Sequence, residues 1–150
     1  MTYEELIEEY QSEVDVIEHN LRENPLINKK GGKGFYYRES DQEVGVAIID
    51  ASLSSIDKKC TLAEEIGHHF TSNGNILQLK YGDAKKQERR AREWGAVKLV
   101  SPDKLFMYCE LYDWDLYKVA EEMQVTAEII TTYLKYISEK GLLSLKRYNL

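Results

Sequence analysis

The sequence CTLAEEIGHHF, residues 60–70, restricts the possible folds of this chain more than any other segment. Its apolar residues recur at helical spacing, which predicts a helix from about residue 57 to residue 74. On a helical wheel Leu62, Ile66 and Phe70 form one apolar face. We therefore expect this face to pack against another element of the fold.

The polar residues of the same helix form a second stripe. Glu64 and His68 are four residues apart, so their head groups lie close enough to hold one metal ion. Glu65 is one step further round, where a general base must lie to take a proton from a water molecule on that metal. In the shifted pairing of Glu65 with His69, apolar Ile66 occupies the base position and the chemistry is lost. We therefore interpret Glu64 and His68 as metal ligands and Glu65 as the base.

A purely structural explanation of the same residues also exists. Thr61 and Glu64 fit a capping box, in which the two side chains bond backbone N–H groups at the start of a helix. Paired histidines on a solvated face are common, and a short motif alone discriminates poorly. Taken in isolation, this segment leaves both explanations open.

A second segment, from about Ala84 to Val100, favours the metal site. It is predicted to be a helix that stops before Ser101 and Pro102, because the residue ahead of a proline avoids the helical region. One stripe of this helix is small or apolar apart from a single glutamate: Ala84, Glu88, Ala91, Gly95 and Leu99. Small residues let two helices approach closely, and a buried carboxylate needs a partner. The partner of Glu88 is either a metal ion or one of the adjacent arginines, Arg89, Arg90 or Arg92. Glu93, on another face, is predicted to be solvated.

The remaining sequence predicts an α+β fold that is mostly helical. Helical spacing from Leu6 to Ile17 indicates a first helix, which Asn24 and Pro25 stop. The β-favouring residues 35–37 and 44–49 indicate a small antiparallel sheet. Two or three further helices are expected after Pro102.

The last of these helices are similar to a helix-turn-helix. Residues 116–134 have apolar residues at core spacings, a turn at Val125, and Thr126 as the N-cap of the second helix. Residues 110–139 contain seven acidic and two basic side chains, which would repel the phosphates of DNA. We interpret the unit as a packing unit or a docking surface for a protein partner.

Length, charge and cysteine content narrow the class of protein. A chain of 150 residues is long enough to bury one hydrophobic core. We divide the chain into a core domain at residues 1–102 and a helical subdomain, packed on that domain, at residues 103–150. The net charge of −6 argues against direct nucleic-acid binding. No stretch approaches the roughly 20 apolar residues of a membrane span, so we expect a cytoplasmic protein with protein or peptide partners. Cys60 and Cys109 are expected to be free, buried thiols.

Together these segments resemble the ImmA/IrrE family of metallopeptidases, in particular its short members from phages and mobile genetic elements. The resemblance rests on residues 62–71 (LAEEIGHHFT) followed by residues 87–94 (QERRAREW). Residues 33–36 (KGFY) and the hydrophobic residues 46–49 add to it, and it covers about residues 3–140.

The resemblance implies an α+β domain with zinc bound by an H-E-x-x-H helix and a downstream glutamate. It also implies an endopeptidase similar in role to an anti-repressor, which cleaves a helix-turn-helix transcriptional repressor of a phage or mobile element. Glu65 matches the catalytic glutamate, His68 the second histidine ligand, and Glu88 the downstream ligand. His69 has two interpretations. It is either an imidazole that supports the metal site, as a possible extra residue there or as a contact to the substrate, or a boundary residue with no task. The expected cofactor is Zn²⁺, with Mn²⁺ or Fe²⁺ less favoured.

The sequence departs from the family pattern at the first ligand, where Glu64 replaces histidine. Carboxylate oxygen binds Zn²⁺ at a distance similar to that of histidine nitrogen, so the geometry can be retained. Two carboxylates and one histidine give a neutral site with Zn²⁺, and a less positive metal lowers the pKa of its water less. The alternative function is therefore a catalytically weak or inactive relative that binds a repressor or another protein without cutting it.

Overall fold

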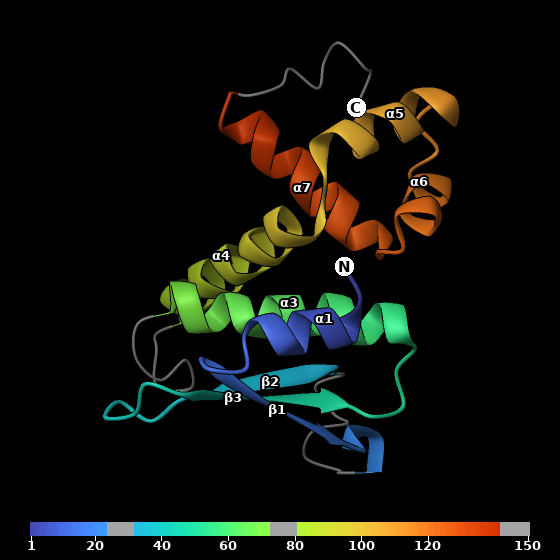
Figure 1. The fold of residues 1–150 in the computed structure, drawn as a ribbon. Helices are drawn as coiled ribbons and strands as arrows, with labels where there is room; N and C mark the ends of the chain where they lie inside the picture. The colour runs from blue at the N-terminus through green and yellow to red at the C-terminus, as the bar shows by residue number, and fades with distance from the viewer. Residues whose placement is uncertain (24–31, 73–80, 142–150) are drawn as a thin grey trace.

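A three-stranded sheet carries one layer of helices, and further helices stack on that layer (Figure 1). The computed structural model describes residues 1–23, 32–72 and 81–141. In chain order the elements are α1 (Tyr3–Glu9), β1 (Val14–His19), the 3-10 helix η1 (Leu21–Glu23), β2 (Gly34–Tyr37), β3 (Gly45–Asp50), α3 (Ser55–Thr71), α4 (Tyr81–Leu99), α5 (Pro102–Leu111), α6 (Leu116–Met123) and α7 (Ala127–Glu139). The predicted α+β class is confirmed.

The N-terminal segment differs from its prediction. The first helix ends at Glu9, and Val14 to His19 form a strand where the spacing predicted a continued helix. This strand, β1, pairs in parallel with β3, from Val14 opposite Gly45 to His19 opposite Asp50. The prediction was wrong because the β-branched residues here gain backbone hydrogen bonds from a strand that lies far away in sequence.

The sheet is consequently mixed and not purely antiparallel. Its strand order is β1-β3-β2, with β3 in the centre. The β2–β3 pair is antiparallel, as predicted, from Gly34 opposite Ile49 to Tyr37 opposite Val46. Among the described residues, β2 is therefore an edge strand, and its outer backbone groups face away from the sheet.

The sheet and the first helical layer share one hydrophobic core. In Figure 1, α3 lies across one face of the sheet with α1 beside it. Leu6, Ile49, Leu62 and Ile66 are fully buried in this core, which confirms that the Leu62–Ile66 face packs inward. Phe70 departs from the expected pattern, because its side chain lies at the end of α3 and is 48% exposed.

Helices α3 and α4 touch backbone to backbone. A Cβ atom on Gly95 would lie 3.1 Å from the carbonyl carbon of Ala63, and one on Gly67 would lie 2.4 Å from the carbonyl oxygen of Ala91. The prediction that the small residues of α4 allow a close approach of two helices is thus confirmed. This contact fixes the position of α4, and of Glu88 on it, relative to α3.

The C-terminal helices form a second hydrophobic core with the N-terminal half of α3 and the C-terminal end of α4. Cys60 and Ala96 belong to this cluster, together with Leu105, Val119 and Ile130. Helices α6 and α7 are joined through Gln124, which has a left-handed backbone (φ 54°), and the hydroxyl of Thr126 accepts the N–H of Ile129 as the predicted N-cap. The boundary at residue 102 and the helix-turn-helix character of this unit stay predictions.

Two smaller predictions also have outcomes. Cys60 and Cys109 are free and buried, as expected. None of the helices in the described ranges has the length and apolar content that crossing a membrane requires. The composition of residues 29–34 (KKGGKG) also predicts a flexible turn, of which residues 29–31 lie outside the described ranges.

Candidate metal centre

Helix α3 begins earlier than a capping box at Thr61 requires. Its N-cap is Ser54, whose hydroxyl accepts the backbone N–H of Asp57 at 3.1 Å. Thr61 therefore lies in the second turn, where backbone N–H groups already bond to carbonyls of the preceding turn. The capping-box explanation of Glu64 is wrong, and its carboxylate is available for a different role.

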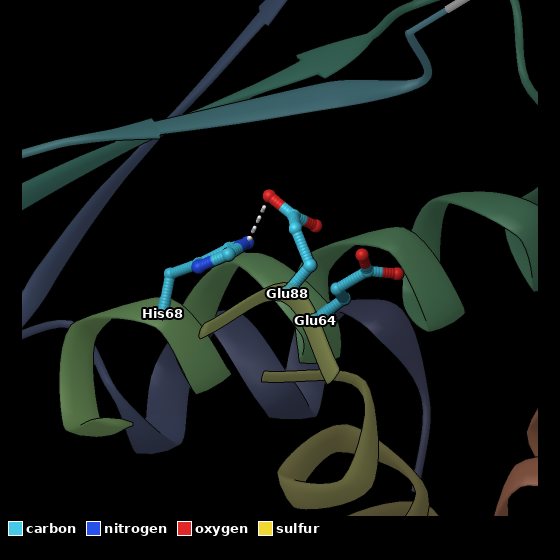
Figure 2. A group of neighbouring side chains, drawn as sticks. All are labelled: Glu64, His68 and Glu88. Carbon is cyan, nitrogen blue, oxygen red and sulfur yellow. Dashed lines mark ion pairs between the residues drawn. The ribbon is translucent and has the colours of Figure 1, made fainter. Parts of the chain in front are cut away.

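Three side chains from two helices converge on one point. Each of Glu64, His68 and Glu88 offers a ligand atom, and these three atoms lie within 4.8 Å of one another. His68 Nε2 and Glu88 Oε1 are 3.4 Å apart. Figure 2 shows the His68 and Glu88 side chains pointing toward each other, with Glu64 on the same side of α3.

The geometry and chemistry of this group fit a zinc ion. Ligands about 2.0 to 2.2 Å from a tetrahedral zinc ion lie roughly 3.4 Å from one another. The His68–Glu88 pair is already at that separation, and the widest pair in the group, at up to 4.8 Å, needs to close by at most about 1.4 Å. One imidazole and two carboxylates are ordinary zinc ligands, and three protein ligands leave the fourth position that a catalytic site requires.

The ring of His68 is held in its orientation by two neighbours that the sequence did not indicate. Its Nδ1 lies 3.2 Å from the hydroxyl oxygen of Ser72, the residue that caps the C-terminal end of α3. The ring of Tyr36, on β2, stacks on it with centroids 6.4 Å apart and planes 12° from parallel. A ligating histidine commonly uses its second nitrogen in such a bond, which leaves Nε2 for the metal. Here Nε2 faces Glu88.

The two glutamates of the group have different environments. Burial raises the pKa of Glu64, and the charge of Arg92 opposes this effect. The hydrogen bond from His68 lowers the pKa of Glu88. The predicted arginine partner therefore exists, but it is Arg92, and it pairs with Glu64 (Nε to Oε1, 3.2 Å) while Glu88 pairs with His68.

Glu65 lies beside the group and is almost fully buried. Its side chain is 7% exposed, and one of its carboxylate oxygens lies 3.2 Å from the position that a Cβ on Gly34 would occupy. Burial raises the pKa of Glu65 well above its ordinary value, and the charges of Glu64 and Glu88 act in the same direction. A carboxylate with a raised pKa is well suited to accept and return a proton near neutral pH.

An open cleft of about 640 Å³ lies over these residues. The edge strand β2 borders it on one side and the start of α7 on another, through Thr126, Glu128 and Ile129. Its charged side chains are mostly acidic: Asp57, Glu64, Glu65, Glu88 and Glu128, against Lys33 and Arg92. The three candidate ligands therefore line a cleft that β2 and the start of α7 border.

Other residues singled out in the sequence lie apart from the converging group. His69 faces Tyr36, with its Nδ1 2.6 Å from the tyrosine hydroxyl, and burial lowers the pKa of its ring. Cys60 lines the cleft one turn before Glu64 but contributes no atom to the group. Glu93 was predicted to be solvated, but its side chain is only 20% exposed and pairs with Arg89 at 2.9 Å.

Three converging donors on two packed helices, with a buried carboxylate beside them and an open cleft, form the arrangement of side chains that a metallohydrolase requires. The comparison with protein families agrees with this class. The family model of the M78 peptidases, described as an IrrE N-terminal-like domain, matches residues 9–135, and the chain belongs to this family. No curated protein and no solved structure matches the chain significantly.

Proposed function

We propose that the protein is a zinc-dependent endopeptidase in which Glu64, His68 and Glu88 hold the metal and Glu65 is the catalytic base. The observation that carries this proposal is the convergence of three ligand atoms within 4.8 Å, on residues that line an open cleft. Zinc is preferred to Mn²⁺ and Fe²⁺ because its intrinsic affinity for such a site exceeds that of both.

The residues of the chain divide the chemistry between them. When bound, zinc would supply a Lewis acid that activates water and polarises the peptide carbonyl. The Glu65 carboxylate takes the proton of the attacking water and passes it to the amine that leaves when the peptide bond breaks. The Ser72 hydroxyl and the Tyr36 ring keep the His68 imidazole oriented during this exchange.

The proposed substrate is a protein. Membership of a peptidase family supports this class of substrate. Within it, a helix-turn-helix transcriptional repressor of a phage or mobile element is the substrate that the resemblance to anti-repressor proteases favours, and the cytoplasm is where the two proteins would meet. The side chain of His69, bonded to Tyr36 at the border of the cleft, is assigned no part in metal binding.

The metal assignment is tested by elemental analysis of protein purified without chelator. The wild-type chain is expected to retain about one zinc ion, and His68→Ala is expected to retain almost none because one of three ligands is removed. Glu65→Gln is the matched control, since it keeps all three ligands and should keep the metal. Near-zero zinc in the wild-type protein would overturn the proposal.

One observation favours a second candidate function, a non-catalytic protein that neutralises a repressor by binding it. Each candidate ligand already has a protein partner: Glu64 pairs with Arg92, and His68 with Glu88. Such a network can persist without metal. Co-expression with a helix-turn-helix repressor separates the two functions, because cleavage fragments that disappear in Glu65→Gln indicate the enzyme. De-repression without fragments, in wild type and Glu65→Gln alike, indicates the binder.

A further inference from the structure

Arg92, on α4, hydrogen-bonds Glu64, the glutamate that replaces the first histidine of the family pattern. It follows Glu88 by four residues, so both side chains leave the same face of α4 toward α3. Its Nε lies 3.2 Å from Glu64 Oε1, and both residues line the cleft. The Glu64 side chain is 28% exposed and that of Arg92 is 50% exposed, so the pair lies at the border between protein and solvent.

The contact with Arg92 engages one named oxygen of the Glu64 carboxylate, Oε1. Arg92 approaches Oε1 through its Nε. The hydrogen bond restricts the rotation of the carboxyl group. Glu64 also interacts with the Glu88 carboxyl group, and a metal held by both carboxylates would replace that interaction. Carboxylates that ligate metals are commonly hydrogen-bonded in this way by residues outside the ligand set. A guanidinium suits this task because its donors form a rigid, planar fork.

The charge of Arg92 also offsets the charge that Glu64 brings to the site. A histidine at position 64 would be a neutral ligand, and zinc with two histidines and one carboxylate has a net charge of about +1. With Glu64 as ligand the same ion has a net charge of about zero, and the adjacent guanidinium returns the local total to about +1.

We infer that Arg92 is a positioning residue of the metal centre, which orients Glu64 as a ligand and compensates for the carboxylate at that position. The inference rests on the proposed function, because it requires Glu64 to be a ligand. It adds a residue that the H-E-x-x-H pattern with its downstream glutamate does not contain, and it accounts for how this chain tolerates glutamate at the first position.

The test is a double-mutant cycle read out as zinc affinity. Wild type, Arg92→Gln, Glu64→His and the double variant are prepared without metal, and the Kd for zinc is measured by competition with a chromophoric chelator. Arg92→Gln should weaken binding about ten- to hundredfold when residue 64 is glutamate, the usual effect of losing such a hydrogen bond. In the Glu64→His background the same change should cause no weakening, because Arg92 has lost its partner there.

A matched control and a spectroscopic readout separate positioning from general effects. Arg90→Gln removes the same charge from an exposed position of α4, two residues away, and should leave the Kd unchanged. The visible spectrum of the cobalt-substituted protein should change in Arg92→Gln and not in Arg90→Gln, because only the first alters a ligand's geometry. Circular dichroism verifies that each variant is folded.

The possible outcomes are distinct. Equal weakening by Arg92→Gln in both backgrounds, or equal effects of Arg90→Gln and Arg92→Gln, would overturn the positioning role and leave the proposed function intact. Tighter zinc binding in Arg92→Gln would show that Arg92 competes with the metal for Glu64, which also overturns it. Absence of zinc binding by the wild-type protein would remove the proposed function and this inference together.

Discussion

Gly67 and Ala91 bring α3 and α4 into backbone contact, since a Cβ on Gly67 would lie 2.4 Å from the Ala91 carbonyl oxygen. His68 follows the glycine directly, and Glu88 lies one turn before the alanine. The distance between the imidazole and the carboxylate therefore depends on how closely these two backbones approach. A residue without a side chain is what makes the candidate metal group geometrically feasible.

Gly67→Ala should consequently destabilise the protein. The added methyl group forces the helices apart, and overpacking of this kind costs about 1 to 3 kcal/mol. Gly95→Ala is the matched comparison and should cost less. Its Cβ would meet backbone atoms of Ala63 and Glu64 at 3.1 Å, which is tight but far less severe than 2.4 Å, and both variants gain the same helix propensity. Urea denaturation gives both free energies of unfolding, and equal losses at the two positions would contradict the role assigned to Gly67.

Zinc should stabilise the folded chain. A ligand that binds only the native state at 100 times its Kd adds about 2.7 kcal/mol to the free energy of unfolding. The wild-type Tm is therefore expected to rise with added zinc and to fall when a chelator removes it. His68→Ala should show neither change, and a wild-type Tm that does not respond to zinc would argue against the metal centre.

Asp50 should make stability depend on acid pH. Its Oδ1 accepts the backbone N–H of Ser52 at 3.0 Å and the Ser52 hydroxyl at 2.9 Å, and Arg22 lies 3.6 Å from Oδ2. The Ser52 backbone hydrogen bond is the largest of the effects that lower the pKa of Asp50 below its ordinary value of 3.8.

Because the folded-state pKa of Asp50 is lowered, its contribution to stability is complete above the ordinary value and is lost as pH falls through the folded-state value. Asp50→Asn removes the charge and should cost about 1 kcal/mol at pH 7. The variant should also lose less stability than wild type between about pH 5 and pH 2. Parallel pH profiles of the two proteins, measured by urea denaturation, would refute this assignment.

Cys109 should be chemically inert in the folded protein. Its side chain is fully buried, and burial raises the pKa of its thiol to about 11. Only the thiolate reacts with disulfide reagents, so a thiol-specific dye at pH 8 should label neither Cys109 nor the buried Cys60 until denaturant is added. Cys109→Ser provides the control, because the number of thiols labelled in denaturant should fall by one. Rapid labelling of Cys109 in native buffer would contradict its burial.

The local arrangement of the candidate site was predictable from the sequence. The pitch of an α-helix places Glu64 and His68 on one stripe whatever surrounds them, and it places Glu65 next to that stripe. The same regularity made the small residues of α4 recognisable as a contact face that includes Glu88. These inferences needed only the helical repeat, and the structure brings the three proposed ligands together.

The spacing of residues along the chain could not predict the contacts between segments that are distant in sequence. Val14 to His19 fit a helical repeat as well as a strand, and the pairing with β3 decides for the strand. The partner of Glu64 among the adjacent arginines depends on how α4 docks on α3. Tyr36 stacks on His68 only because β2 lies along the edge of the sheet next to α3.

The sequence by itself thus determined which side chains share a helix face, since that follows from a fixed rise and rotation per residue. The tertiary structure alone decided which faces meet, which backbones approach closely enough for a glutamate to reach a histidine, and which charge lies beside Glu64. Those distances depend on the packing of residues remote in the chain, and no local pattern encodes them.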